Sequence, residues 1–134
     1  MKPFLGAEST IRVGVEIVLE SESVGGERGV VFEDDGDTGY FYARDFSKPS
    51  PSVVDALHVY DVAAVTDAER PSKVKIIWSR DFMVAALLIN QRPHVVFNFA
   101  KRCGYAMKPF PEPSENSCWT HEVIHSDLIS LFHG

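Results

Sequence analysis

The pattern most suggestive of chemistry lies near the carboxyl end, where His121, Glu122 and His125 form a His-Glu-x-x-His string. On a helix, two histidines four residues apart share a face and can bind zinc, while the glutamate acts as a general base. A catalytic site also needs a third protein ligand, but the positions where an extended form of the pattern would place its next residues are Leu128 and Leu131. The string therefore predicts a small metal-dependent hydrolase only if an upstream histidine completes the set. Otherwise the two histidines flank the apolar face of a helix.

A second group of polar residues is acidic, with carboxylates at Glu33, Asp34, Asp35 and Asp37. Such oxygens can hold Ca²⁺ or Mg²⁺. The spacing of a calcium-binding helix-loop-helix is not met, because its first and last ligand positions would fall on a valine and a tyrosine. We expect a solvated hairpin tip, which could also bind a cation weakly or dock a basic partner.

A third group combines Tyr60, Trp78 and His94, each on a segment predicted to be a strand. A small-ligand sensor could use them to line a pocket between a sheet and a helix. Along residues 94–99, alternation places His94 on the face opposite Val95, so a half-buried, hydrogen-bonded histidine is the simpler interpretation. Cys103 follows two basic residues, but we expect it to be a buried structural cysteine.

The elements that position these groups are predicted mainly from apolar alternation, which is typical of strands with one solvated face. Asp35-Gly36 between two β-rich runs indicates a hairpin. Residues 53–65 are ambiguous, and a short helical turn followed by a strand is favoured. The predicted strands cover residues 11–20, 28–33, 39–44, part of 53–65, 73–79, 83–89 and a run beginning at Pro93.

A helix is predicted to follow these strands. Thr120 is a suitable cap, and Trp119 and Ile124 occupy the positions of a hydrophobic staple. Apolar residues then recur at helical spacing, at Ile124, Leu128, Leu131 and Phe132. The predicted fold class is therefore α+β: one domain over residues 1–134, with about seven mostly antiparallel strands and a C-terminal amphipathic helix packed on the sheet.

Composition narrows the function classes. The chain has 134 residues and a net charge of -6, which disfavours nucleic acid and anionic lipid as partners and favours basic ones. Two cysteines are too few for a disulfide framework, and neither a signal peptide nor a long apolar span is present. We therefore expect a cytoplasmic protein that binds neither nucleic acid nor membrane and needs no cofactor.

Several strings together resemble a family of small bacterial proteins known only as a domain of unknown function. The resemblance covers roughly residues 28–113, leaves the His121–His125 string outside, and implies no activity, cofactor or site residue. The strings that carry it are Gly29–Ala43, Asp55–Tyr60, Trp78–Ser79, Ala85–Asn90, Pro93–Phe99 and Gly104–Tyr105.

No complete catalytic set is present, so the leading hypothesis is a non-enzymatic binding module that recognises a basic protein. The first alternative is the metal-dependent hydrolase, and the second is the small-ligand sensor. The sequence leaves the oligomeric state and the strand order open.

Overall fold

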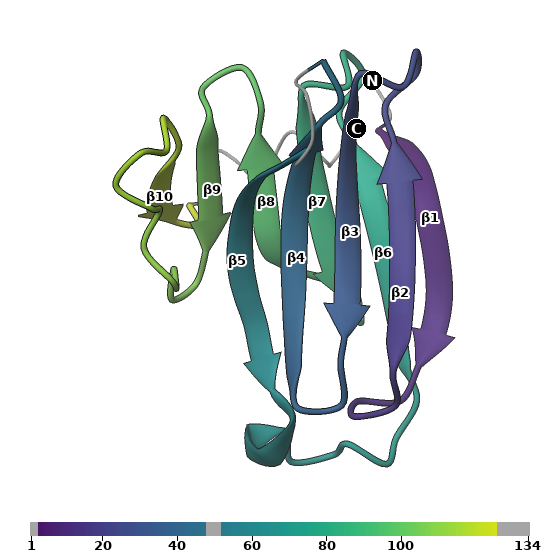
Figure 1. Cartoon of the computed structure of the whole chain (residues 1–134). Helices are drawn as coiled ribbons and strands as arrows, with labels where there is room; N and C mark the ends of the chain where they lie inside the picture. The colour runs from purple at the N-terminus through teal and green to yellow at the C-terminus, as the bar shows by residue number, and fades with distance from the viewer. Residues whose placement is uncertain (1–2, 48–51, 126–134) are drawn as a thin grey trace.

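Two β-sheets face each other in the computed structural model, which describes residues 3–47 and 52–125 (Figure 1). Apolar alternation gives each strand an inner and an outer face, so two sheets can share one core. The elements, in chain order, are β1 (Phe4–Ile11), β2 (Ile17–Glu22), β3 (Arg28–Asp34), β4 (Thr38–Asp45), β5 (Val53–Asp61), the short 3₁₀ helix η1 (Val62–Ala64), β6 (Ser72–Trp78), β7 (Val84–Ile89), β8 (Arg92–Asn98), β9 (Cys103–Ala106) and β10 (Thr120–Val123).

Over the described residues, one sheet has six strands in the order β1-β6-β7-β8-β9-β10, and the other has four in the order β2-β3-β4-β5. Neighbouring strands are antiparallel except β9 and β10, which are parallel. In Figure 1 the four-stranded sheet lies in front, so its outer face is turned toward the viewer.

The core lies between the sheets and receives side chains from both. Phe41 of β4 stacks on Phe97 of β8, with ring centroids 5.3 Å apart. Trp119 meets the Phe97 ring edge-on at 5.9 Å. Trp78 is fully buried, and its indole N–H donates to Ser21 Oγ at 2.8 Å. These contacts bury the largest aromatic side chains and fix how the two sheets face each other.

The predicted C-terminal helix, and with it the α+β fold class, is wrong. Thr120–Val123 forms β10, and the described residues contain no α-helix, so the fold is nearly all β. Four backbone positions of β10 pair with β9, a long-range partner that local helical spacing cannot reveal. The predicted stripe residues Leu128, Leu131 and Phe132 lie outside the described residues.

Two local predictions also need correction, and a third is confirmed. The single strand predicted over residues 11–20 is two strands, joined by a turn in which Gly14 has φ +91°. The order predicted within residues 53–65 is reversed, because β5 precedes η1. The hairpin at Asp35-Gly36 is confirmed, and Gly36 has φ +98°. No helix among the described residues is long and apolar enough to cross a membrane.

Candidate functional site

The outer face of the four-stranded sheet carries a row of aromatic side chains. Tyr40 and Tyr42 alternate with the buried Phe41 and Ala43 on β4, so both tyrosines point outward. Their rings stack at 5.9 Å with an interplanar angle of 17°. His58 lies opposite Tyr40 on β5 and meets its ring edge-on at 5.5 Å.

Phe110 extends this row beyond the edge of the sheet. The backbone N–H of His58 donates to the carbonyl of Phe110 at 2.7 Å, which fixes the loop against β5. The Phe110 ring meets the His58 ring edge-on at 5.9 Å and remains 58% exposed. Four rings therefore follow one another across the outer face, from Tyr42 through Tyr40 and His58 to Phe110.

Carboxylates border the aromatic row. Glu33 lies opposite Tyr40 on β3 and accepts a hydrogen bond from the Tyr42 hydroxyl at 3.4 Å. Burial, together with the Glu33 charge, raises the pKa of Tyr42, so the phenol stays protonated and remains a donor. Glu20 and Glu22 are exposed on β2 and share this outer face by alternation.

We call this surface the acidic aromatic face, defined by Tyr40, Tyr42, His58, Phe110, Glu20, Glu22 and Glu33. Its bordering cation, Arg44, already has partners. The Arg44 guanidinium lies 4.6 Å from the centre of the Phe46 ring, and Nε donates to Ser52 Oγ at 3.0 Å. Both printed partners of Arg44 are uncharged, and neither is a carboxylate of the acidic aromatic face.

The carboxylates of the hairpin tip have separate roles. Asp34 is only 1% exposed and accepts hydrogen bonds from Gly14 N, Gly36 N and the Tyr60 hydroxyl. Asp35 accepts from the backbone N–H groups of the next turn, and these bonds lower its pKa. Two of the four predicted docking carboxylates are thus committed to the turn. Asp37 is exposed at the tip, and Glu33 belongs to the acidic aromatic face.

The His-Glu-x-x-His string does not have the geometry that a zinc helix would give it. His121 and Glu122 are neighbours on β10, so they point to opposite faces. His121 Nε2 contacts both carboxylate oxygens of Asp55 at 2.8 and 2.9 Å. Glu122 instead accepts from Cys103 Sγ at 3.3 Å, and His125 packs edge-on against a tyrosine ring. Within residues 3–47 and 52–125, no group of three or more His, Cys, Asp or Glu residues could hold a metal ion.

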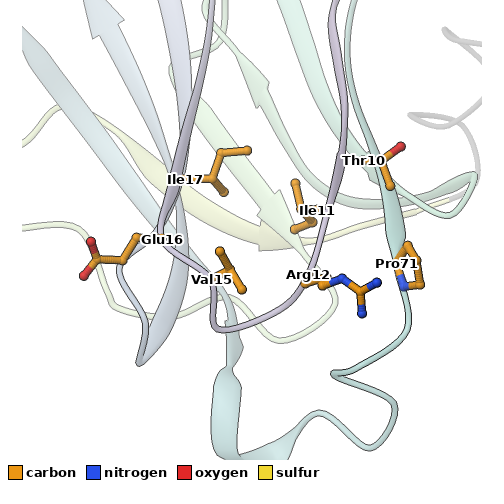
Figure 2. Close-up of a pocket in the computed structure, with 7 residues that line it drawn as sticks. All are labelled: Thr10, Ile11, Arg12, Val15, Glu16, Ile17 and Pro71. Atoms are coloured by element: carbon orange, nitrogen blue, oxygen red, sulfur yellow. The ribbon is translucent and has the colours of Figure 1, made fainter.

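The predicted sensor residues are brought together only in part. Tyr60 and His94 line the same pocket, at one end of the sandwich beside the residues that follow η1. Trp78 lies elsewhere in the core. A separate hollow of about 340 Å³ lies beside the turn between β1 and β2 (Figure 2).

The sequence pattern does not single out the aromatic members of the acidic aromatic face. Tyr40, Tyr42 and Phe110 are absent from the predicted site residues, and His58 enters only as an upstream histidine that could complete the His-Glu-x-x-His set. The available signal was the alternation in residues 39–43, where two tyrosines flank an inward phenylalanine. The position of Phe110 beside His58 depends on a contact between distant segments, so the linear pattern does not contain it.

Comparison with known proteins gives two matches. A family described as "Uncharacterized protein conserved in bacteria (DUF2251)" matches residues 11–133, a range that includes the His121–His125 string. An "Uncharacterized protein" of Haemophilus influenzae (strain ATCC 51907 / DSM 11121 / KW20 / Rd) is 46% identical over 95 residues, covering 71% of this chain and 59% of that protein. The matched part is therefore less than two thirds of the relative's length. No solved structure gives a significant match.

Proposed function

This chain belongs to the family of uncharacterized proteins conserved in bacteria (DUF2251), and from that premise we propose that it is a binding module whose acidic aromatic face recognises a basic protein segment. The observation that supports the proposal is the row of four neighbouring rings bordered by carboxylates. The family description assigns no activity, so the chemistry of the face is the basis of the proposal.

Aromatic rings and carboxylates attract the same groups. The face of a tyrosine or phenylalanine ring attracts a guanidinium or ammonium, with about 0.5–1 kcal/mol at exposed sites. Carboxylates such as Glu20 and Glu33 add charge complementarity, which steers a basic partner and fixes its orientation. The net charge of -6 acts in the same direction at longer range.

The spacing of the rings favours an extended segment. Side chains two residues apart in an extended chain lie roughly 6.6 Å apart along the strand and point to the same side. The Tyr40 and Tyr42 rings are 5.9 Å apart, which is close to that spacing. We therefore expect a partner segment with arginine or lysine at alternate positions.

The test is a binding titration with a labelled synthetic peptide that alternates arginine and serine. We expect saturable binding to the intact protein that weakens as salt is added, because exposed charges are screened. Tyr42→Ala should weaken binding about two- to fivefold, which corresponds to the loss of one exposed ring–cation contact of about 0.5–1 kcal/mol. Anisotropy of the labelled peptide reports the change.

Two comparisons separate this face from general charge attraction. Tyr40→Phe keeps the ring and should bind like the unchanged protein. Glu69→Gln removes an exposed carboxylate in the loop between η1 and β6, away from the acidic aromatic face, and should have little effect. If Glu69→Gln weakened binding as much as Glu33→Gln did, the proposal would fail, because the whole surface would then be responsible.

A further inference from the structure

Two β-bulges at one end of the sandwich turn a side chain from each sheet toward the same space. In β8, Leu87 pairs with Val95 and Leu88 pairs with Pro93, so His94 is an extra residue with no partner on β7. A bulge of this kind re-aims the side chains beside it and occurs often next to functional sites. His94 accordingly lines a pocket together with the inward-facing Ile11, contrary to strict alternation along β8.

The four-stranded sheet has a matching irregularity. Gly39 pairs with Tyr60 and Tyr40 pairs with His58, so Val59 is the extra residue of β5. Both Val59 and Tyr60 pack against the core, and the Tyr60 hydroxyl donates to the buried Asp34 at 2.6 Å. Tyr60 thus lines the pocket from the four-stranded sheet, whereas His94 lines it from the six-stranded sheet.

The pocket between these bulges, which we call the end pocket, has a volume of about 470 Å³. This lies within the range of about 300–1,000 Å³ that is usual for small-molecule sites. Its walls are apolar at Ile11, Val13 and Ile89, and its polar groups include Arg92 and His94. The end pocket is open to solvent and mixed in character, with an apolar side that can take a hydrocarbon body and polar groups that can orient a small organic ligand.

The two basic side chains of the end pocket, Arg92 and His94, have no partner in the part of the chain that the structure describes. Among the described residues, neither ring nitrogen of His94 has a hydrogen-bond partner, and Arg92 forms no ion pair. Burial, and secondarily the neighbouring Arg92 charge, lowers the pKa of His94, so its ring is neutral near pH 7 and can donate one hydrogen bond. A guanidinium and an imidazole N–H together form a donor set that suits an anion.

We propose that the end pocket binds a small organic monocarboxylate, with its apolar body against Ile11 and Ile89 and its carboxylate at Arg92 and His94. Asp67 also lines the pocket and repels negative charge, which favours a single charge over the double charge of a phosphate monoester.

The hollow beside the β1–β2 turn is a poorer candidate for such a ligand. Figure 2 shows Ile11, Val15 and Ile17 gathered there, and the Arg12 side chain already donates to the backbone of Glu69.

The experiment is a titration of the intact protein with hexanoate, followed by NMR of the backbone amides and the His94 ring. We expect saturable shifts at Ile89, Arg92 and His94. Arg92→Gln should weaken hexanoate binding about tenfold or more, as expected for the loss of a charged hydrogen-bonding partner. Lys108→Gln removes an exposed positive charge outside the end pocket and should leave the affinity unchanged.

Three further probes decide the ligand class. Hexanol has the same apolar body without a charge and should bind more weakly, and hexyl phosphate should bind no better than hexanoate. Val13→Phe places a ring in the end pocket and should abolish the shifts while Arg92 remains. Equal affinity for hexanol, tighter binding of hexyl phosphate, or no saturable shift at His94 with millimolar hexanoate would overturn the proposal. Because peptide binding at the acidic aromatic face is measured separately, either proposal can fail without the other.

Discussion

Asp34 is a carboxylate in the surroundings of a core residue. It is only 1% exposed, and its two oxygens accept two backbone N–H groups and one phenol. These bonds link the β1–β2 turn, the β3–β4 turn and β5 at one end of the sandwich. A buried charge is tolerated when its hydrogen-bonding capacity is used in this way.

Removing this carboxylate should therefore be costly. Asp34→Ala leaves the N–H groups of Gly14 and Gly36 and the Tyr60 hydroxyl without their acceptor. Each unsatisfied group costs about 1–3 kcal/mol when buried, and some of these groups can reach water, so we expect a loss of about 2–4 kcal/mol in the free energy of unfolding. Urea unfolding measures it. Asp37→Ala, at the exposed tip of the same hairpin, should change stability by less than about 0.5 kcal/mol, and equal losses would contradict this account.

At the scale of elements, β9 has a glycine, Gly104, where it packs against buried side chains of β5. Gly104 pairs with Phe97 of β8 on one side and with His121 of β10 on the other. A Cβ atom there would lie 2.8 Å from Leu57 Cδ1 and 2.9 Å from Asp55 Oδ2, both of which are buried. Such distances are too short for van der Waals contact, so the buried Leu57 and Asp55 side chains, or the strands that carry them, would have to shift.

Gly104→Ala should destabilise the protein by about 1–3 kcal/mol, the usual cost of overpacking a well-packed core. Thermal unfolding detects this as a lower midpoint temperature. Asn116→Ala changes an exposed loop residue that precedes β10 and serves as the control. If both variants unfolded at the midpoint of the unchanged protein, the tight approach of β9 to β5 would not be a constraint on this fold.

At the scale of the whole molecule, the two sheets are linked at one edge by a buried acid–base pair. Asp55 belongs to the four-stranded sheet and His121 to the six-stranded sheet, and their side chains are 4% and 6% exposed. His121 Nδ1 is the buried side-chain N or O atom without a hydrogen-bond partner among the described residues. Burial raises the pKa of Asp55 above its ordinary 3.8, although His121 acts in the opposite direction.

This raised pKa predicts a pH dependence with a definite sign. A carboxyl whose pKa is higher in the folded state stabilises that state most below its ordinary pKa, and this contribution is lost as pH rises through the raised value. The free energy of unfolding, relative to that of Asp55→Asn, should thus fall as pH rises above 3.8, by about 1.4 kcal/mol for each unit by which the pKa is raised. Urea unfolding of both proteins at acidic pH measures it. A constant difference between them would show that His121 offsets the desolvation of Asp55.

Local sequence patterns predicted several strands of both sheets correctly. The strands at residues 28–33, 39–44, 73–79 and 83–89 and the turn at Asp35-Gly36 follow from side-chain period and turn chemistry, which depend on neighbouring residues. The resemblance to a bacterial family of unknown function was also visible in the strings of the sequence and is confirmed.

What the sequence determined by itself was the β character of most segments, the hairpin and the acidic charge, because each is a property of adjacent residues or of composition. The tertiary structure decided three further features: β10 in place of a helix, the bulges that bring His94 and Tyr60 to one pocket, and the position of Phe110 beside His58. Each of them depends on pairing between residues distant along the chain. Such a contact stabilises the fold only when both partners are in place. A segment whose local pattern suits either a helix or a strand therefore becomes a strand when a neighbouring strand pairs with it.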